Sequence, residues 1–173
     1  MWGMGYTRGG QLGTKFVKNG NISGTYSTVP ILIDADVVAA RAGNGFSLYL
    51  KSDGSLWGTG MNSYGQLGDG TTEMHLAPIQ ITTGVIDIAA GGYHTLFLKT
   101  DGDLWGLGGN WKGQLGDGTK ESRSEPVLID EDVIDIDAGS NHSLYIKRDG
   151  SLWGMGNNLS GALGDRDSAT LTN

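Results

Sequence analysis

The chain of 173 residues contains no cysteine, three prolines and three histidines. The lack of cysteine excludes disulfides and thiolate metal sites. No stretch approaches the roughly 18 apolar residues of a membrane span, and no charged stretch followed by an apolar one resembles a signal peptide. A net charge of -7 disfavours nucleic acid and anionic membrane surfaces as main partners. These absences predict a soluble chain with neither nucleic acid nor membrane as its partner, and they leave its compartment open.

Glycine, in contrast, is abundant, with 31 residues against a usual share of about 7%. Prolines are few and no polar low-complexity tract is present, so the glycines do not indicate disorder. They recur in a pattern in which Leu-Trp-Gly-x-Gly is followed by Gly-Gln-Leu-Gly-Asp-Gly-Thr. The tryptophan of this pattern stands at Trp2, Trp57, Trp105 and Trp153. The last three copies are therefore 48 residues apart, and the first carries seven extra residues between Gly13 and Pro30.

The repeats cover approximately residues 1–55, 56–103 and 104–151, with a partial fourth at 152–173. Periods of about 20 to 50 residues are typical of solenoids and propellers, in which one supersecondary unit cannot bury its apolar face alone. We therefore expect residues 1–173 to form a single repeat array.

Each period contains four short β-rich runs, which in one copy lie at 78–81, 85–91, 95–100 and 103–108. Apolar residues alternate along these runs, and no run shows a helical period. An Asp-Gly pair joins the last two runs, and such a pair predicts a hairpin with a type I′ turn. The sequence thus predicts an all-β fold of propeller blades, each with four antiparallel strands.

The combined pattern, LWGxGxNxxGQLGDGT, then proline, then AGxxHSLxLKxDG, resembles the regulator of chromosome condensation (RCC1) repeat, as found in many bacterial proteins. This resemblance implies a seven-bladed propeller whose members act mostly through protein–protein contacts. Those contacts include guanine-nucleotide exchange on a small GTPase and inhibition of a β-lactamase. Neither activity transfers residue by residue, and Phe46 departs from the pattern where other copies have His94 and His142.

The chain accounts for about 3.5 repeats, so a seven-bladed ring needs roughly twice its length. A partial propeller exposes sheet faces and edges that a closed ring would bury. Two explanations remain open. Either the remaining blades belong to a longer chain, or two copies join head to tail in a homodimer.

Residues that recur in every copy are predicted to be structural. We expect the repeated tryptophans to pack between blades and the Gly-x-Leu-Gly elements to form tight connections rather than phosphate loops. His94 and His142 are expected to make structural hydrogen bonds.

Residues that vary between the copies indicate a binding surface, because variable loops on a rigid frame usually carry specificity. The candidate partner-binding residues on the variable loops are Arg8, Tyr64, Trp111, Lys112 and Leu159. Loop-on-loop packing is the alternative interpretation.

These observations favour a non-enzymatic protein-binding scaffold, with no catalytic residue, cofactor or metal predicted. A locally basic segment at 15–29, with Lys15 and Lys18, offers a contact for an acidic partner or is a solvated loop. The alternatives are a carbohydrate-binding module, an exchange-factor or enzyme-inhibitor role, and a propeller enzyme. An enzyme would depend on His75, the histidine that has no counterpart in the other repeats.

Overall fold

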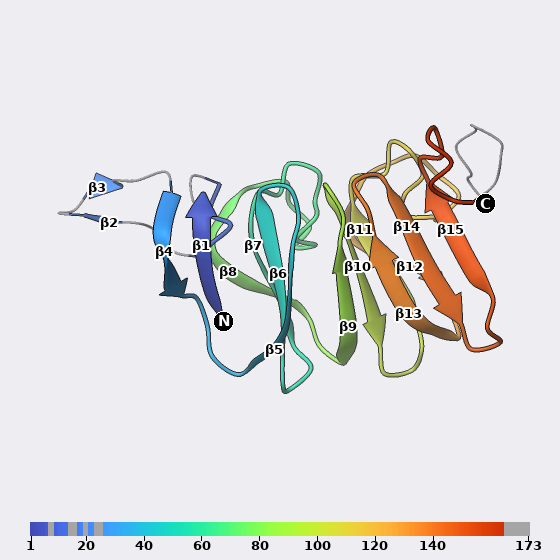
Figure 1. Ribbon diagram of the computed structural model, residues 1–173, viewed down its shortest axis with the longest axis horizontal. Coiled ribbons are helices and arrows are strands. Elements are labelled where there is room, and N and C mark those ends of the chain that lie inside the picture. Colours follow the sequence, from blue (N-terminus) through green and yellow to red (C-terminus); the bar gives the residue numbers. More distant parts are fainter. Residues whose placement is uncertain (7–8, 14–16, 19–20, 23–25, 165–173) are drawn as a thin grey trace.

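The computed structural model describes residues 1–6, 9–13, 17–18, 21–22 and 26–164, and every regular element among them is a β-strand. The strands form four successive blades (Figure 1). The first blade holds β1 (Trp2–Tyr6) and β4 (Tyr26–Leu32), and the second holds β5 (Val37–Ala42), β6 (Phe46–Lys51), β7 (Leu56–Gly60) and β8 (His75–Thr82). The third holds β9 (Val85–Ala90), β10 (His94–Lys99), β11 (Leu104–Gly108) and β12 (Arg123–Asp130), and the fourth holds β13 (Val133–Ala138), β14 (His142–Lys147) and β15 (Leu152–Gly156).

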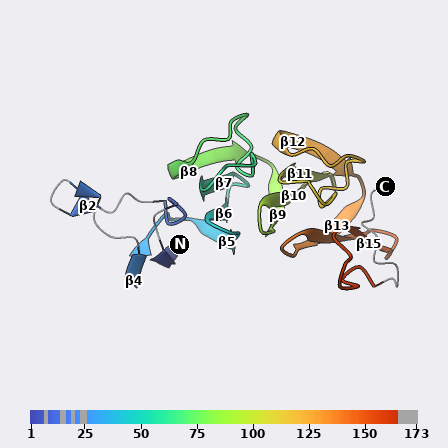
Figure 2. The same cartoon turned by 90° about the horizontal axis from the view of Figure 1, so that it is seen from above.

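All strand pairs are antiparallel, and the second and third blades contain the four strands that the sequence predicts. Seen from above, the blades follow one another in an arc (Figure 2). The first strand of each later blade, β5, β9 or β13, lies beside the next one along the arc. A short hairpin of β2 (Val17–Lys18) and β3 (Asn21–Ile22) lies within the longer segment of the first repeat.

The predicted Asp-Gly hairpins are present, but their turn type differs from the prediction. Gly54 has a φ of +79°, whereas Asp53 is not among the described residues with positive φ. Two hydrogen bonds close the turn, from Lys51 N–H to the Ser55 carbonyl and from Gly54 N–H to the Lys51 carbonyl, both at 3.0 Å. This pattern is a three-residue loop whose final glycine is left-handed, so only one residue needs positive φ and type I′ was wrong.

Neighbouring blades pack through two apolar faces. We call the face toward the following blade the front face and the face toward the preceding blade the back face. The front face of the third blade contributes Leu96, Leu98, Leu104 and Leu115, and the back face of the fourth contributes Val133, Ile136, Tyr145 and Met155. Burial of each such side chain contributes about 1.5–3 kcal/mol. The apolar core therefore lies between blades, which is why one repeat cannot be stable alone.

One of the repeated tryptophans, Trp105, lies at such an interface, whereas Trp2 is 66% exposed and Trp153 is 41% exposed. Trp105 packs against the cluster between the second and third blades and stacks on Phe97, with ring centroids 6.4 Å apart. Trp57 and Trp153 stack in the same way on Tyr49 and Tyr145. The predicted packing between blades is thus seen at Trp105, and the stacking on a ring of the same blade recurs at Trp57 and Trp153.

The strand positions also bear on the head-to-tail homodimer, one of the two explanations that the sequence left open. Among the described strands, the first blade has only the third and fourth strands of the repeat, and the last blade has the first three. Joining two copies end to start would place two third-position strands, β15 and β1, in one blade. A two-fold axis along a ring also requires an even number of blades, so it cannot produce seven.

Candidate functional site

The loop that follows the third strand is held by a buried asparagine in the second, third and fourth blades. In the second blade, Asn62 accepts a hydrogen bond from Leu67 N–H (2.8 Å) and donates one from Nδ2 to Asp69 Oδ1 (3.1 Å). Asn110 makes the equivalent pair of bonds in the third blade. Asn62 and Asn110 are fully buried. The residues between each asparagine and the next leucine are thus presented on a rigid base, at the upper end of the blades in Figure 1.

The aspartate of this loop ties its two ends together. Asp69 accepts hydrogen bonds from Thr71 N–H (3.0 Å) and Thr71 Oγ1 (2.9 Å), and its Oδ2 lies 2.6 Å from His75 Nε2. Burial opposes ionisation of Asp69, but the bonds from Thr71 and His75 outweigh it and lower its pKa. In the third blade Arg123 takes the place of His75, with Nε 2.7 Å from Asp117 Oδ2. These carboxylates are structural, and His75 is part of the same clamp.

Three aromatic rings meet above this frame. The centroid of Tyr64 lies 4.7 Å from that of Trp111, and Tyr93 lies 5.2 Å from Tyr64 and 5.8 Å from Trp111. Tyr64 and Trp111 come from equivalent loops of neighbouring blades, and Tyr93 comes from the turn between β9 and β10. Asn44 Nδ2 donates a hydrogen bond to the Tyr93 hydroxyl. We call Tyr64, Tyr93 and Trp111 the aromatic cluster.

The position of Trp111 depends on Gly109. A Cβ atom added at Gly109 would lie 2.2 Å from the six-membered ring of Trp111, so only glycine lets this ring fold back over the backbone. Trp111 is half-buried, and Tyr64 remains 40% exposed. The cluster is therefore packed across two blades, as the loop-on-loop interpretation expects, and the rim of Tyr64 is exposed.

The other candidate residues take less part in the cluster. Lys112 follows Trp111 and is half-buried, and its backbone N–H donates to Gln114 Oε1 (2.9 Å). Leu159 is 68% exposed on the equivalent loop of the fourth blade. Arg8 and Lys15 lie outside the described residues, as does the side chain of Lys18. Tyr93 was missed because it belongs to a turn that otherwise matches the repeat, and its departure from the Asn of "GSNH" is the signal that would have revealed it.

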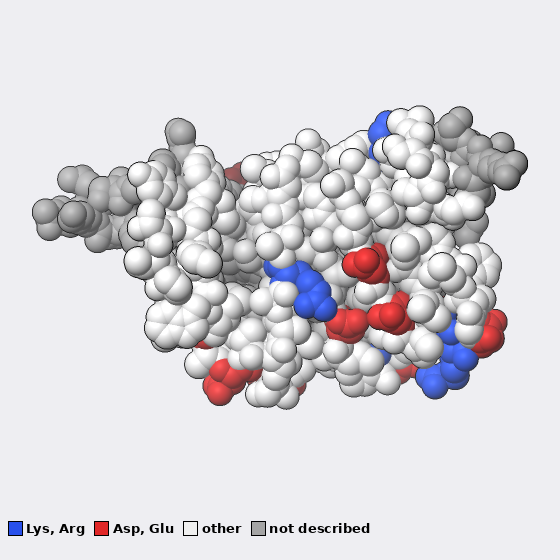
Figure 3. All heavy atoms as spheres, in the orientation of Figure 1, with Lys and Arg blue, Asp and Glu red and all other residues white. Residues whose placement is uncertain are grey.

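The first strands carry charges along the inner side of the arc. Arg41 lies 3.8 Å from Asp87 across β5 and β9, and Asp135 and Asp137 are exposed on β13. Figure 3 shows acidic and basic groups close together over these strands on an otherwise mostly uncharged face. The Oδ1 atoms of Asp87, Asp135 and Asp137 each accept the N–H of the following residue. This local bonding is typical of strand irregularity rather than of acid catalysis.

His94 is fully buried beneath the turn between β9 and β10. Its Nε2 lies 2.8 Å from Ser143 Oγ, and Ser143 Oγ also donates to the Gln114 carbonyl (2.8 Å). Burial, with the nearby His142 as a second cause, lowers the pKa of His94 to about 4. A neutral buried imidazole bonded to a serine of the next blade fits the predicted structural role.

Among the described residues, no group of three or more His, Asp or Glu is placed to hold a metal ion. No helix of the described part is long and apolar enough to cross a membrane.

Two models of the regulator of chromosome condensation (RCC1) repeat match this sequence. One matches residues 53–98 and 101–146, and the other matches residues 37–66, 85–114 and 133–162. No curated protein sequence is significantly similar.

Solved structures show the same architecture. Human WBSCR16 is 26% identical, with a TM-score of 0.80 over 98% of this chain and 46% of that protein. Yeast RCC1 (Prp20), solved bound to Kap60, is 21% identical, with a TM-score of 0.81 over 99% of this chain and 43% of that protein. A further structure of Prp20p from Saccharomyces cerevisiae gives 21% identity and a TM-score of 0.82 over 99% and 44%. The chain thus spans less than half the length of each of these proteins and shares their propeller fold.

Proposed function

Because the chain belongs to the regulator of chromosome condensation (RCC1) repeat family, we propose that it is a non-enzymatic scaffold that binds a protein partner through its variable loops. The aromatic cluster carries this proposal. Its three residues lie outside the shared pattern of the repeat and meet on a rigid base. Large aromatic side chains that are partly exposed and held rigid are the usual anchors of protein interfaces.

The solved relatives support this class of function without naming the partner. One structure is of Prp20 bound to Kap60, and another concerns the binding of Prp20p to Gsp1p and histones. These partners are proteins. The identity to Prp20 is too low to transfer any of them to this chain.

A carbohydrate-binding module is the weaker alternative. A sugar ring stacks on an open aromatic face, but Trp111 is folded over Gly109 and lies in contact with Tyr64. The arrangement presents ring edges and the Tyr64 rim rather than a flat platform. Such a compact apolar group suits a shaped pocket or side chain of a protein partner.

Affinity capture tests the proposal. The full chain is immobilised and exposed to an extract of the organism that encodes it, and each captured protein is then purified and assayed for direct binding. We expect a partner that is retained by the wild type and by Leu128→Ala, which alters an exposed leucine of β12 far from the loops. Trp111→Ala should lose that partner. Binding on a glycan array that disappears in Trp111→Ala would favour the carbohydrate module instead.

A further inference from the structure

The loops beside the aromatic cluster bind their own carboxylates. In the second blade, Asp69 Oδ2 lies 2.6 Å from His75 Nε2. In the third blade, Asp117 Oδ2 lies 2.7 Å from Arg123 Nε. Burial raises the pKa of both aspartates, but the bonds from these side chains and from the following threonines outweigh it and lower both pKa values. The two carboxylates are thus ionised and paired within their own loops.

A lysine beside the cluster is not paired in this way. Lys112 follows Trp111 on the loop of the third blade, and its backbone N–H donates to Gln114 Oε1. None of the described residues forms an ion pair or a cation–π contact with its ammonium group. In a chain of net charge -7, the charge left free next to the aromatic cluster is therefore positive.

The rings of the cluster also present hydrogen-bond donors. The Tyr93 hydroxyl accepts a bond from Asn44 Nδ2, so its own proton is free to donate. The Tyr64 hydroxyl and Trp111 Nε1 have no partner among the described residues, and neither belongs to the buried unpaired atoms. An indole Nε1 can only donate. The cluster thus combines apolar rings with donor groups that have no acceptor.

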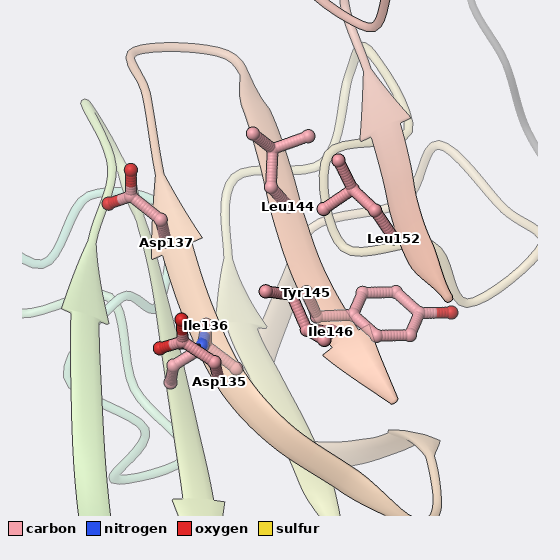
Figure 4. Close-up of a pocket in the computed structure, with 7 residues that line it drawn as sticks. All are labelled: Asp135, Ile136, Asp137, Leu144, Tyr145, Ile146 and Leu152. Atoms are coloured by element: carbon pink, nitrogen blue, oxygen red, sulfur yellow. Dashed lines mark hydrogen bonds between the residues drawn. The ribbon is translucent and has the colours of Figure 1, made fainter. Parts of the chain in front are cut away.

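The apolar hollow on the fourth blade carries the opposite charge. This hollow of about 200 Å³ is lined by Leu144 and Leu152 together with Asp135 and Asp137, and no described Lys or Arg lines it. Figure 4 shows both aspartate side chains projecting from the same side of β13. An acidic ligand is repelled at this hollow and attracted at the aromatic cluster, so charge distinguishes the two apolar surfaces.

We propose that the aromatic cluster and Lys112 together bind an acidic and apolar segment of the partner, in which an Asp or Glu stands beside a large apolar residue. The apolar residue packs on Trp111 and on the exposed rim of Tyr64. The carboxylate pairs with Lys112 and accepts hydrogen bonds from the ring donors, since an ionised carboxylate only accepts. This inference rests on the proposed function and specifies the chemistry of the partner.

A single-stranded nucleic acid is another anion that aromatic rings and a lysine can bind. It requires open ring faces for stacking and a positively charged groove along its backbone. Here the ring centroids lie 4.7–5.8 Å apart, so the rings cover one another, and the chain as a whole is acidic. These observations favour a polypeptide, and binding of a nucleic acid becomes one outcome of the test.

A random peptide library displayed on phage tests the inference without the natural partner. The immobilised full chain selects binders, and those that also bind the Trp111→Ala variant are discarded. Each remaining peptide is synthesised and titrated against the purified chain by fluorescence anisotropy. We expect most of the remaining peptides to contain Asp or Glu next to Leu, Ile, Phe or Trp.

Charge reversal then identifies the contact. Lys112→Glu should raise the dissociation constant of a selected peptide by at least about fivefold, and a peptide whose acidic residue is replaced by Lys should regain binding to this variant. Such rescue also shows that the variant is folded. Lys120→Glu makes the same charge change later in the same loop and should alter the constant by less than about twofold. Leu152→Ser, at the hollow of the fourth blade, should leave it unchanged.

The outcomes separate this inference from the proposed function. Peptides that need Trp111 but lack acidic residues, or that bind Lys112→Glu as tightly as the wild type, would overturn the inference and leave the proposed function standing. Failure to select any peptide that depends on Trp111 would overturn both. A labelled single-stranded oligonucleotide that binds the wild type and not Trp111→Ala would also overturn the inference and identify nucleic acid as the ligand.

Discussion

The second and third blades share one backbone plan but differ in the polar bonds that the second strand of each makes to the segment preceding the blade. In the second blade, the Tyr49 hydroxyl (2.8 Å) and Lys51 Nζ (2.9 Å) both bond to Asp34 Oδ2, and the bond from Lys51 is the main cause that lowers the pKa of Asp34. In the third blade, Phe97 and Thr82 stand at the positions of the tyrosine and the aspartate. The stacking of ring on tryptophan is nevertheless the same in both blades.

This difference shows which interactions determine the shape of a blade. The buried leucines and the asparagine of the loop are kept, with Leu48 and Leu96 fully buried at equivalent positions. The polar bonds of Tyr49 and Lys51 have no counterpart in the third blade, and Trp105 Nε1 is buried there without an acceptor. Apolar packing therefore determines the shape, and the polar bonds contribute smaller increments that can be exchanged between blades.

The largest effect is expected where apolar packing is complete. Leu96→Ala should lower the free energy of unfolding by about 2–5 kcal/mol, because Leu96 is enclosed between the third and fourth blades. Leu144→Ala, at the same position of the fourth blade, should cost about 1 kcal/mol or less because that face is open. Urea unfolding of both variants measures the difference. Equal costs would contradict the assignment of the core to blade interfaces.

A second effect depends on pH. The pKa of His94 is about 4 in the folded chain and about 6.5 when unfolded. As pH falls below about 6.5, the unfolded chain binds a proton first, so stability decreases until about pH 4 and then levels off. At pH 5 the loss should be about 2 kcal/mol relative to pH 8.

His94→Phe, which copies Phe46 of the second blade, should abolish that part of the pH dependence. Ser143 Oγ keeps its bond to the Gln114 carbonyl in this variant. Urea unfolding from pH 8 to pH 5 compares the two proteins. An unchanged slope in His94→Phe would show that other groups cause the acid sensitivity.

A smaller gain is expected from giving Trp105 its missing acceptor. In the second and fourth blades, Trp57 and Trp153 donate from Nε1 to Ser55 and Ser151 (2.9 Å each), and Asp103 stands at the serine position of the third blade. Asp103→Ser should therefore raise the free energy of unfolding by about 1 kcal/mol. Glu121→Ser removes the same charge from an exposed loop and should be nearly neutral. A similar gain in both variants would indicate relief of charge repulsion alone.

The smallest effect concerns the ion pair between Lys51 and Asp34 of the second blade. In the third blade Lys99 and Thr82 stand at these two positions. Thr82→Asp should restore a carboxylate near Lys99 and stabilise the chain by about 0.5 kcal/mol at low ionic strength, with most of the gain lost in 1 M salt (the concentration at which the screening length is about 3 Å). Thr83→Asp, one residue further along, serves as the control. Thermal unfolding in both salt conditions would detect the difference, and an equal gain from Thr83→Asp would exclude a specific pair.

Much of this fold could be predicted from spacing alone. The recurrence of tryptophan, glycine and proline defines the blades because each stands at the same position of successive repeats. The Asp-Gly hairpins were located correctly, but the turn type was wrong, because Lys51 and Ser55 close a longer loop than the dipeptide indicates.

The candidate site was less accessible to sequence reasoning. Tyr64 and Trp111 were selected because they vary, yet their mutual contact depends on how far one blade is rotated from the next. That rotation follows from side-chain packing, which no repeat period encodes. Tyr93 joins them through a turn whose pattern matches the repeat, and only the fold brings it alongside.

The affinity of the captured partner tests the central claim most directly. Calorimetric titration of the purified partner into the wild type, Trp111→Ala and Leu128→Ala compares the aromatic cluster with an exposed leucine of the frame. We predict that Trp111→Ala raises the dissociation constant by at least about tenfold and that Leu128→Ala leaves it unchanged. An unchanged constant for Trp111→Ala, with normal folding, would contradict the assignment of binding to the variable loops.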